Sequence, residues 1–110
     1  MTTIVFYRTE EGILGFKAQD HAGYAPEGSD IVCAAISALT QTTVVGLNEV
    51  VGVSCQWEMD DGFLSCFLPR DLSQDQWEQS QIVLETLFKG LAAIRTDYDE
   101  YLSIREVQSL

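Results

Sequence analysis

Two residues with catalytic potential lie close together in the first third of the chain. His21 is the only histidine, and Cys33 is one of three cysteines. A thiol with an imidazole in hydrogen-bond reach can attack a carbonyl carbon when backbone N–H groups stabilise the oxyanion that forms. The sequence therefore permits nucleophilic thiol catalysis, provided that the fold brings the imidazole and the sulfur together.

The sequence around Cys33 indicates the start of a helix. Residues recur there at helical spacing, at Val32, Ala35, Ile36, Leu39 and Thr43. Asp30 stands just before this pattern and is the predicted N-cap, with Ser29 as the competing cap. Cys33 would then lie in the first helical turn, where free N–H groups and the helix dipole favour thiolate over thiol.

The segment before this helix is able to deliver the histidine to the sulfur. Residues 13–19 alternate between apolar and polar or small side chains, which predicts a strand that ends near His21. Residues 22–29 follow as a loop with two glycines and a proline, long enough to fold back onto the helix start. Ser37 lies one helical turn beyond Cys33, so its hydroxyl is expected on the same side.

The same residues also have a purely structural interpretation. A cysteine after a helix cap is more often a small packed residue than a nucleophile. A histidine at a strand end is commonly a polar surface residue, and Asp30 needs no role beyond capping. The spacing alone leaves both interpretations open, because the pairing of Cys33 with His21 is spatial and not sequential.

The run from His21 to Ser37 resembles the signature of the ribosomal-processing cysteine proteases. In that family a Gly-His-Ala turn, a mobile glycine-containing loop and an Asp-Ile-Val-Cys-Ala-x-x-Ser helix start recur at this spacing. The matching residues here are His21, Ala22 and the run Asp30-Ile31-Val32-Cys33-Ala34-Ala35-Ile36-Ser37. Asp20 stands where the family commonly has glycine. This departure bears on the backbone conformation at the strand end and adds a carboxylate beside the histidine.

The resemblance implies a cysteine endopeptidase in which His21 is the general base and Cys33 the nucleophile. Asp30 and Ser37 match supporting positions, and the N–H groups of the helix start are expected to stabilise the oxyanion. The implied substrate is the N-terminal extension of a large-subunit ribosomal protein, number twenty-seven, cut after an aromatic residue during ribosome maturation. The loop would act as a substrate-binding lid, with its key positions at Gly23, Tyr24, Pro26, Gly28 and Ser29.

The chain is strongly acidic, with 17 acidic and 6 basic residues and a formal net charge of −11. Such a surface repels phosphates, so direct binding of nucleic acid is not expected. A basic protein is a natural partner because opposite charges speed encounter, although a role in solubility alone explains the same composition. The charge suits a basic ribosomal protein as substrate. It equally suits a non-catalytic module that binds such a protein or an assembly factor.

Length and composition fit one globular domain over residues 1–110. The chain is 46% hydrophobic and 21% charged, which are ordinary values for a folded protein in water. No apolar run is expected to approach the length of a membrane span, and the N-terminus lacks the basic and apolar segments of an export signal. We therefore expect a cytoplasmic protein that does not bind membranes.

Free thiols are expected for all three cysteines in that compartment. Cys55 and Cys66 lie on the strands of a predicted hairpin and are expected to be buried thiols without chemistry. A redox-sensing role for Cys33 is weaker than a nucleophilic one, because no resolving cysteine lies close in sequence. No cofactor is expected, since a lone histidine and scattered carboxylates give no metal-ligand spacing.

Hydrophobic periodicity and turn residues predict seven elements in the order ββαββαβ. The predicted strands are residues 2–9, 13–19, 53–58, 63–68 and 98–107, and the predicted helices are residues 30–51 and 73–95. Two hairpins indicate a largely antiparallel sheet with both helices on one face, an α+β two-layer sandwich. Tyr7, Trp57 and Tyr101 are expected on the open face. Such a patch, together with the resemblance, suggests a homodimer.

Overall fold

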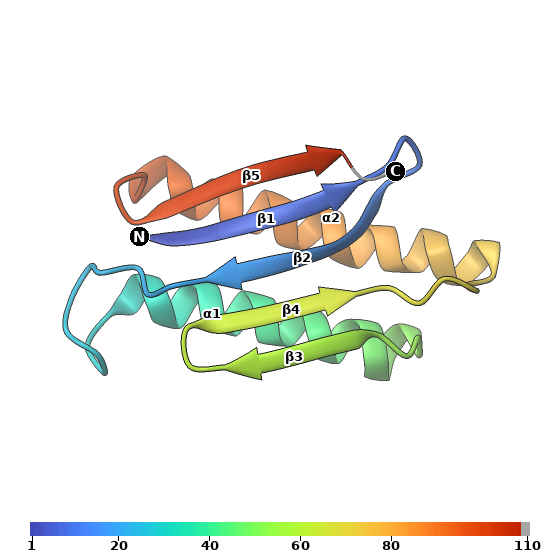
Figure 1. Ribbon diagram of the computed structural model, residues 1–110, viewed down its shortest axis with the longest axis horizontal. Helices are drawn as coiled ribbons and strands as arrows, with labels where there is room; N and C mark the ends of the chain where they lie inside the picture. Colours follow the sequence, from blue (N-terminus) through green and yellow to red (C-terminus); the bar gives the residue numbers. More distant parts are fainter. Residues whose placement is uncertain (109–110) are drawn as a thin grey trace.

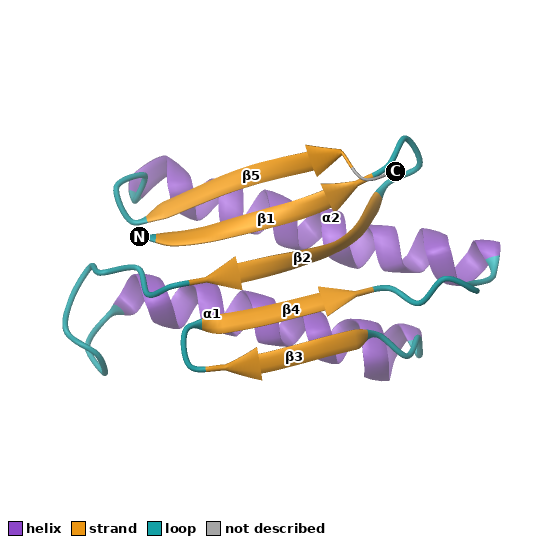
Figure 2. Ribbon diagram, in the orientation of Figure 1, coloured by secondary structure: helices purple, strands orange, loops and turns teal. Residues whose placement is uncertain are grey.

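The computed structural model describes residues 1–108 and confirms the order ββαββαβ. Its strands are β1 (Thr2–Arg8), β2 (Ile13–Gln19), β3 (Gln56–Asp60), β4 (Phe63–Phe67) and β5 (Leu102–Gln108). Its helices are α1 (Ile31–Val45), continued by the π-helical segment η1 (Gly46–Val51), and α2 (Gln74–Asp97). Figures 1 and 2 show one sheet with both helices on the same face, which is the predicted α+β two-layer arrangement.

The sheet is mixed, with strand order β3-β4-β2-β1-β5. All neighbouring strands are antiparallel except β1 and β5, which run parallel with Ile4 opposite Ile104. The path of α2 explains this exception (Figure 1). This helix crosses behind the sheet and returns the chain to the end where β1 begins, as a parallel connection requires.

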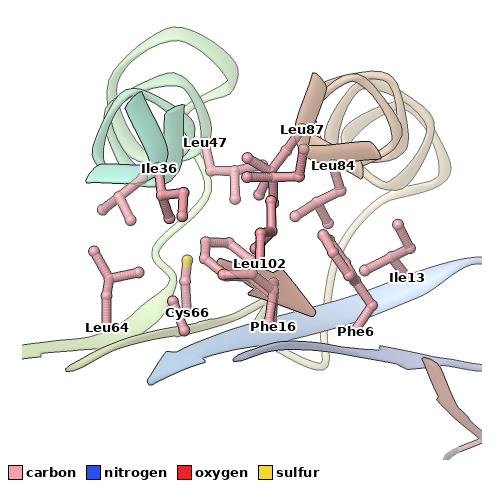
Figure 3. Packing of buried hydrophobic residues seen from close by; sticks show 14 of the residues in the cluster. Phe6, Ile13, Phe16, Ile36, Leu47, Leu64, Cys66, Leu84, Leu87 and Leu102 are labelled. Atoms are coloured by element: carbon pink, nitrogen blue, oxygen red, sulfur yellow. The ribbon is translucent and has the colours of Figure 1, made fainter. Parts of the chain in front are cut away.

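The core lies between the sheet and the two helices. Alternation along the strands and periodicity along the helices give each element one apolar face. Figure 3 shows Phe6 and Phe16 pointing from the sheet towards the helices, with Leu84 and Leu87 of α2 opposite them. The side chains of Phe6, Phe16 and Leu84 are completely buried. Burying each such side chain stabilises the fold by about 1.5–3 kcal/mol, so the packed core fixes α1 and α2 on the sheet.

The predicted helix over residues 30–51 forms, and its last turns are π-helical. The segment Ile31–Val51 has 21 residues and a mean hydropathy of 1.5, which is long and apolar enough to cross a membrane by length and composition alone. The expectation that no apolar run approaches this length was therefore wrong. A helix that packs against the core of a globular fold satisfies the same criteria. Val32, Ile36 and Val44 of this helix are buried in the core.

Strand β3 begins three residues later than predicted, because the backbone before it forms hydrogen bonds with the end of the long helix. The N–H groups of Gly52 and Val53 both donate to the carbonyl of Leu47 at 3.0 Å. The N–H of Cys55 donates to the Asn48 side chain, also at 3.0 Å. Residues 52–55 are thus held against the helix, and Cys55 precedes the strand instead of lying on it.

Helix α2 begins with a capping box. The Ser73 hydroxyl accepts from the N–H of Gln76 at 3.2 Å, and the Gln76 side chain accepts from the N–H of Ser73 at 3.4 Å. The helix extends to Asp97, and Tyr98 caps its end. A turn closed by the N–H of Tyr101 and the carbonyl of Tyr98 occupies the predicted start of the last strand.

Trp57 does not lie on the open face of the sheet, so that expectation was wrong. It pairs with Cys66, which points into the core, and residues paired across strands share a face. Tyr7 alternates with the buried Phe6 and does lie on the open face, where its ring is 5.2 Å from that of Phe67. Tyr101 precedes β5, and its ring packs against that of Tyr24. Of the three aromatic residues predicted for the open face, Tyr7 is therefore the one that lies there, beside Phe67.

Candidate active site

Asp30 caps α1 as predicted, and Ser29 does not. The Asp30 carboxylate accepts the N–H of Cys33 at 2.9 Å, and the Asp30 carbonyl accepts the N–H of Ala34 at 3.0 Å. Ser29 instead donates its N–H to the carbonyl of Pro26 at 2.9 Å and closes a turn in the preceding loop. Cys33 therefore lies in the first turn of α1, at the positive end of the helix dipole.

The same carboxylate also ties the loop of residues 22–29 to the helix. Its second oxygen accepts the N–H of Tyr24 at 2.9 Å and that of Ala25 at 3.3 Å. Burial alone would raise the pKa of the Asp30 carboxyl. The hydrogen bonds from Cys33, Ala25 and Tyr24 outweigh burial, so this pKa lies below its usual range. Asp30 thus stays ionised and does more than the capping role that its sequence position requires.

The fold brings the predicted pair together. His21 follows β2, and its Nδ1 lies 3.8 Å from the sulfur of Cys33. The backbone N–H of Ala22 donates to the same sulfur at 3.2 Å. Hydrogen bonds at catalytic centres are often long before substrate binds, so this separation suits proton transfer after a small adjustment. The sulfur therefore has a base on one side and a backbone donor beside it.

The helix-start donors expected for the oxyanion are already occupied. The N–H of Cys33 is donated to Asp30, and the N–H of Val32 also interacts with that carboxylate. The N–H of Ala22 points at the sulfur from outside the helix. The N–H of Ala22, which donates to the Cys33 sulfur, thus lies at the start of the loop, a position that the helical pattern did not reveal.

Asp20 adopts the left-handed conformation that glycine normally takes, with φ of +71°. Two contacts hold its backbone there. Its N–H donates to the carbonyl of Gly62 at 2.8 Å, and its carbonyl accepts the Thr2 hydroxyl at 3.0 Å. Aspartate tolerates this region better than most residues, so the glycine-type turn before His21 survives the departure from the family pattern.

The carboxylate that contacts the imidazole belongs to Asp61 and not to Asp20. Asp61 lies in the turn between β3 and β4, with Oδ1 3.4 Å from Nε2 of His21. In the sequence, the Asp61-Gly62 pair is typical of a hairpin turn and gives no sign of a role beside the histidine. Its position beside His21 follows from the pairing of β2 with β4, in which Gln19 lies opposite Phe63. Local patterns carry no signal for such a contact.

Cys33 and His21 lie between two hollows. One, of about 210 Å³, is bounded by the end of β2, α1 and the β3–β4 turn. The other, of about 480 Å³, lies beneath the loop and is lined by Gly23 and Gly28 among others. Ser37 lines both hollows together with the candidate pair, as its helical spacing predicted. The sulfur is thus accessible from either side, as an extended peptide crossing the site would require.

The predicted substrate-binding residues of the loop separate into two groups. Gly23 and Gly28 line the larger hollow, and both have positive φ values, +76° and +88°. Tyr24 faces away from it, because its ring packs edge to face against Tyr98 and Tyr101 at centroid distances of 5.7 and 5.1 Å. Pro26 and Ser29 form the turn already described and do not line the hollow.

Comparison with known proteins identifies the family of the chain. Residues 1–103 match the sequence family described as cysteine protease Prp. The chain belongs to this family and is a cysteine protease. It is 27% identical, over 97 residues, to the ribosomal processing cysteine protease Prp of Bacillus subtilis strain 168. That match covers 86% of this chain and 87% of the relative.

Several solved structures share the fold. The Staphylococcus aureus protease Prp with a covalently linked product peptide has a TM-score of 0.87 and 24% identity, covering 97% of this chain and 100% of that one. The same protease with a substrate peptide has a TM-score of 0.77 and 23% identity, covering 99% and 100%. SMU.848 from Streptococcus mutans has a TM-score of 0.78 and 24% identity, covering 99% and 96%.

A Prp-family protease needs an accessible thiol as its nucleophile. The three free cysteines differ in their burial and in the residues that they contact. Cys66 is 1% exposed, and its hydrogen bond with Cys55 together with burial raises its pKa. The same hydrogen bond lowers the pKa of Cys55, which is half-buried. Cys66 is therefore buried as expected, whereas Cys55 is only half-buried and precedes its strand. Cys33 is the cysteine that contacts the histidine. Among residues 1–108, no group of three or more His, Cys, Asp or Glu side chains is placed to hold a metal.

Proposed function

We propose that this Prp-family protease uses a Cys33–His21 dyad to remove the N-terminal extension of a large-subunit ribosomal protein, number twenty-seven. The observation that carries the proposal is the 3.8 Å separation between His21 Nδ1 and the Cys33 sulfur at a helix N-terminus. This arrangement supplies a base, a nucleophile and a positive local potential at one point.

The proposed reaction begins when Nδ1 of His21 takes the proton of the Cys33 thiol. The thiolate attacks the scissile carbonyl carbon, and the N–H of Ala22, which donates to the sulfur before substrate binds, is proposed to donate to the oxyanion that forms beside it. As the C–N bond breaks, the imidazolium returns the proton to the leaving amine and a thioester remains. Water, deprotonated by His21, then attacks the thioester, which releases the acid and restores the thiol.

The proposed substrate rests on the relatives and on charge. The Bacillus subtilis relative is named a ribosomal processing cysteine protease. Structures of the Staphylococcus aureus protease contain a substrate peptide or a covalently linked product peptide. The net charge of −11 favours encounter with a basic ribosomal protein and disfavours nucleic acid. We place this reaction in the cytoplasm, where ribosomes are assembled.

The loop of residues 22–29 is proposed to act as the lid over bound peptide. Gly23 and Gly28 supply positive-φ positions near its two ends, which suit a hinge. Asp30 holds the N-terminal half of the loop through two backbone N–H groups. A homodimer is proposed through the open sheet face, where Tyr7 lies beside Phe67 and pairs with the exposed Val107.

Replacement of the nucleophile tests the proposal. Cys33→Ala is expected to fold normally and to lower the rate of cleavage by about three orders of magnitude or more, because no other thiol contacts a histidine. The measurement is mass spectrometry of the purified ribosomal protein, carrying its extension, after incubation with each variant. Cys55→Ala is the matched control and should retain cleavage. Release of the mature N-terminus by Cys33→Ala would rule out the assignment.

A further inference from the structure

The turn between β3 and β4 is fixed against the imidazole of His21. The carbonyl of Gly62 accepts the N–H of Asp20 at 2.8 Å, which ties the turn to the residue before the histidine. Gly62 has φ of +68°, and a Cβ added there would lie 3.2 Å from Nε2 of His21. Glycine therefore serves both the turn and its close approach to the ring.

This approach places a carboxylate opposite the nucleophile. Oδ1 of Asp61 lies 3.4 Å from Nε2 of His21, while Nδ1 of the same ring faces the Cys33 sulfur at 3.8 Å. The Asp60 side chain accepts the N–H of Asp61 at 2.8 Å and stabilises the turn in this conformation. The imidazole thus lies between a thiol and a carboxylate, each facing a different ring nitrogen.

We propose that Asp61 is a positioning residue for the histidine. By accepting the Nε2–H, its carboxylate favours the tautomer whose unprotonated Nδ1 faces the thiol. After proton transfer, the same carboxylate stabilises the imidazolium and so the thiolate–imidazolium pair. The inference rests on the proposed Cys33–His21 dyad and adds an acidic third member from a separate hairpin.

The other charged groups near the ring do not take this role. Those lining the two hollows with His21 are Asp20 from the end of β2, Asp60 from β3, and Glu27 and Asp30 from the loop. Asp30 is engaged with backbone N–H groups, and Asp60 with the N–H of Asp61. Among residues 1–108, only the Asp61 carboxylate lies within ion-pair distance of His21.

The solvent exposure of Asp61 determines how strongly its carboxylate interacts with His21, both in the free enzyme and when peptide is bound. The Asp61 side chain is 81% exposed, so water weakens its interaction with His21 in the free enzyme. Asp61 and the candidate dyad line the same hollow of about 210 Å³. Peptide bound there would exclude water and strengthen the interaction. Loss of Asp61 is therefore expected to affect peptide cleavage more than reaction with a small thiol reagent.

The test compares Asp61→Ala and Asp61→Asn with Glu58→Gln. Glu58 is on the same hairpin but pairs with Ser65, so its side chain lies on the face opposite that of Met59 and Leu64. Iodoacetamide alkylation of Cys33, resolved by mass spectrometry, and peptide cleavage are both measured from pH 5 to 10. Asp61→Ala should lower kcat/KM about three- to tenfold near neutral pH and move the alkaline limb of cleavage about half a unit lower. Asp61→Asn, which keeps an acceptor without the charge, should lie between wild type and Asp61→Ala, and Glu58→Gln should match wild type.

A pH profile of Asp61→Ala identical to that of Glu58→Gln would overturn the inference. His21→Ala separates this failure from failure of the dyad itself. If His21→Ala abolishes cleavage while Asp61→Ala does not change it, the dyad stands and only the role of Asp61 is wrong. If His21→Ala changes neither alkylation of Cys33 nor cleavage, both proposals are wrong.

Discussion

Asp20 shows how one residue can carry backbone strain that orients its neighbour, here His21. Its φ of +71° orients the chain so that His21 faces the start of α1 and the turn at Gly62. For most residues the left-handed region costs about 1–2 kcal/mol, and for aspartate somewhat less. The conformation persists because hydrogen bonds to Thr2 and Gly62 hold it on both sides.

Relief of this strain gives the first stability prediction. Asp20→Gly should raise the free energy of unfolding by about 0.5–1 kcal/mol, because glycine adopts positive φ without steric cost and this gain exceeds its added entropy in the unfolded chain. Asp20→Ala should lower it, since alanine lacks the tolerance of aspartate. Urea denaturation measures both. A lower unfolding midpoint for Asp20→Gly would show that the aspartate side chain contributes more than its backbone costs.

Asp30 gives a prediction about acid stability. Its pKa is depressed in the folded state, so its contribution is fully present above the unfolded value of about 3.9 and is lost as the pH falls through the folded value. The pKa of Glu85 is also lowered, by its hydrogen bonds with Arg8, and adds to the same trend. Unfolding free energy should therefore fall below about pH 4.

The Asp30→Asn variant measures how much of this loss of unfolding free energy at low pH comes from Asp30. The variant should be less stable than wild type at pH 7, and the difference should shrink as the pH approaches 3. Thermal unfolding followed by circular dichroism across this range provides the measurement. A constant difference between the two proteins at every pH would mean that the carboxylate charge has no part in stability.

At the scale of elements, the sequence predicted those features that depend on neighbouring residues. Asp30 and the periodicity after it identified the start of α1, and hydrophobic periodicity predicted a helix from residue 73, where Ser73 caps α2. The start of β3 was missed because Leu47 and Asn48 engage the backbone before it. These contacts depend on where the long helix ends, which no local pattern states.

The same distinction applies to the candidate site: residues placed by local patterns could be predicted, and residues placed by strand pairing could not. His21 and Cys33 were predictable because a strand end and a helix start flank one loop. Asp61 was not, because its contact with His21 requires β4 to pair with β2 in a particular register. The face occupied by Trp57 was missed for the same reason, since it is set by pairing with Cys66.

The loop of residues 22–29 gives a prediction at this scale. The Tyr24 ring is held by edge-to-face contacts with Tyr98 and Tyr101, and each such pair contributes about 0.5–1.5 kcal/mol. Tyr24→Ala should raise amide hydrogen exchange in the loop about tenfold while exchange in the sheet core stays unchanged. Tyr24→Phe keeps the ring and is the control that should match wild type. Equal exchange in all three proteins would show that the ring does not restrain the loop.

At the scale of the molecule, the order of elements followed from the sequence but the order of strands did not. The parallel pairing of β1 with β5 depends on α2 running behind β2 and β1 to the edge where β5 lies. Helical periodicity describes α2 itself and says nothing of which sheet edge its end reaches. The resulting sheet has β1 and β2 in its interior, so the strand that delivers His21 is supported on both sides.

The hydrogen bond from Thr2 to Asp20 also determines which end of the chain suits an affinity tag. It brings the first residues of the chain beside the candidate site, and Thr2 itself lines the smaller hollow. Strand β5 ends at the opposite side of the sheet (Figure 1). An affinity tag joined ahead of Met1 would therefore emerge beside the smaller hollow and compete with incoming peptide for the same space.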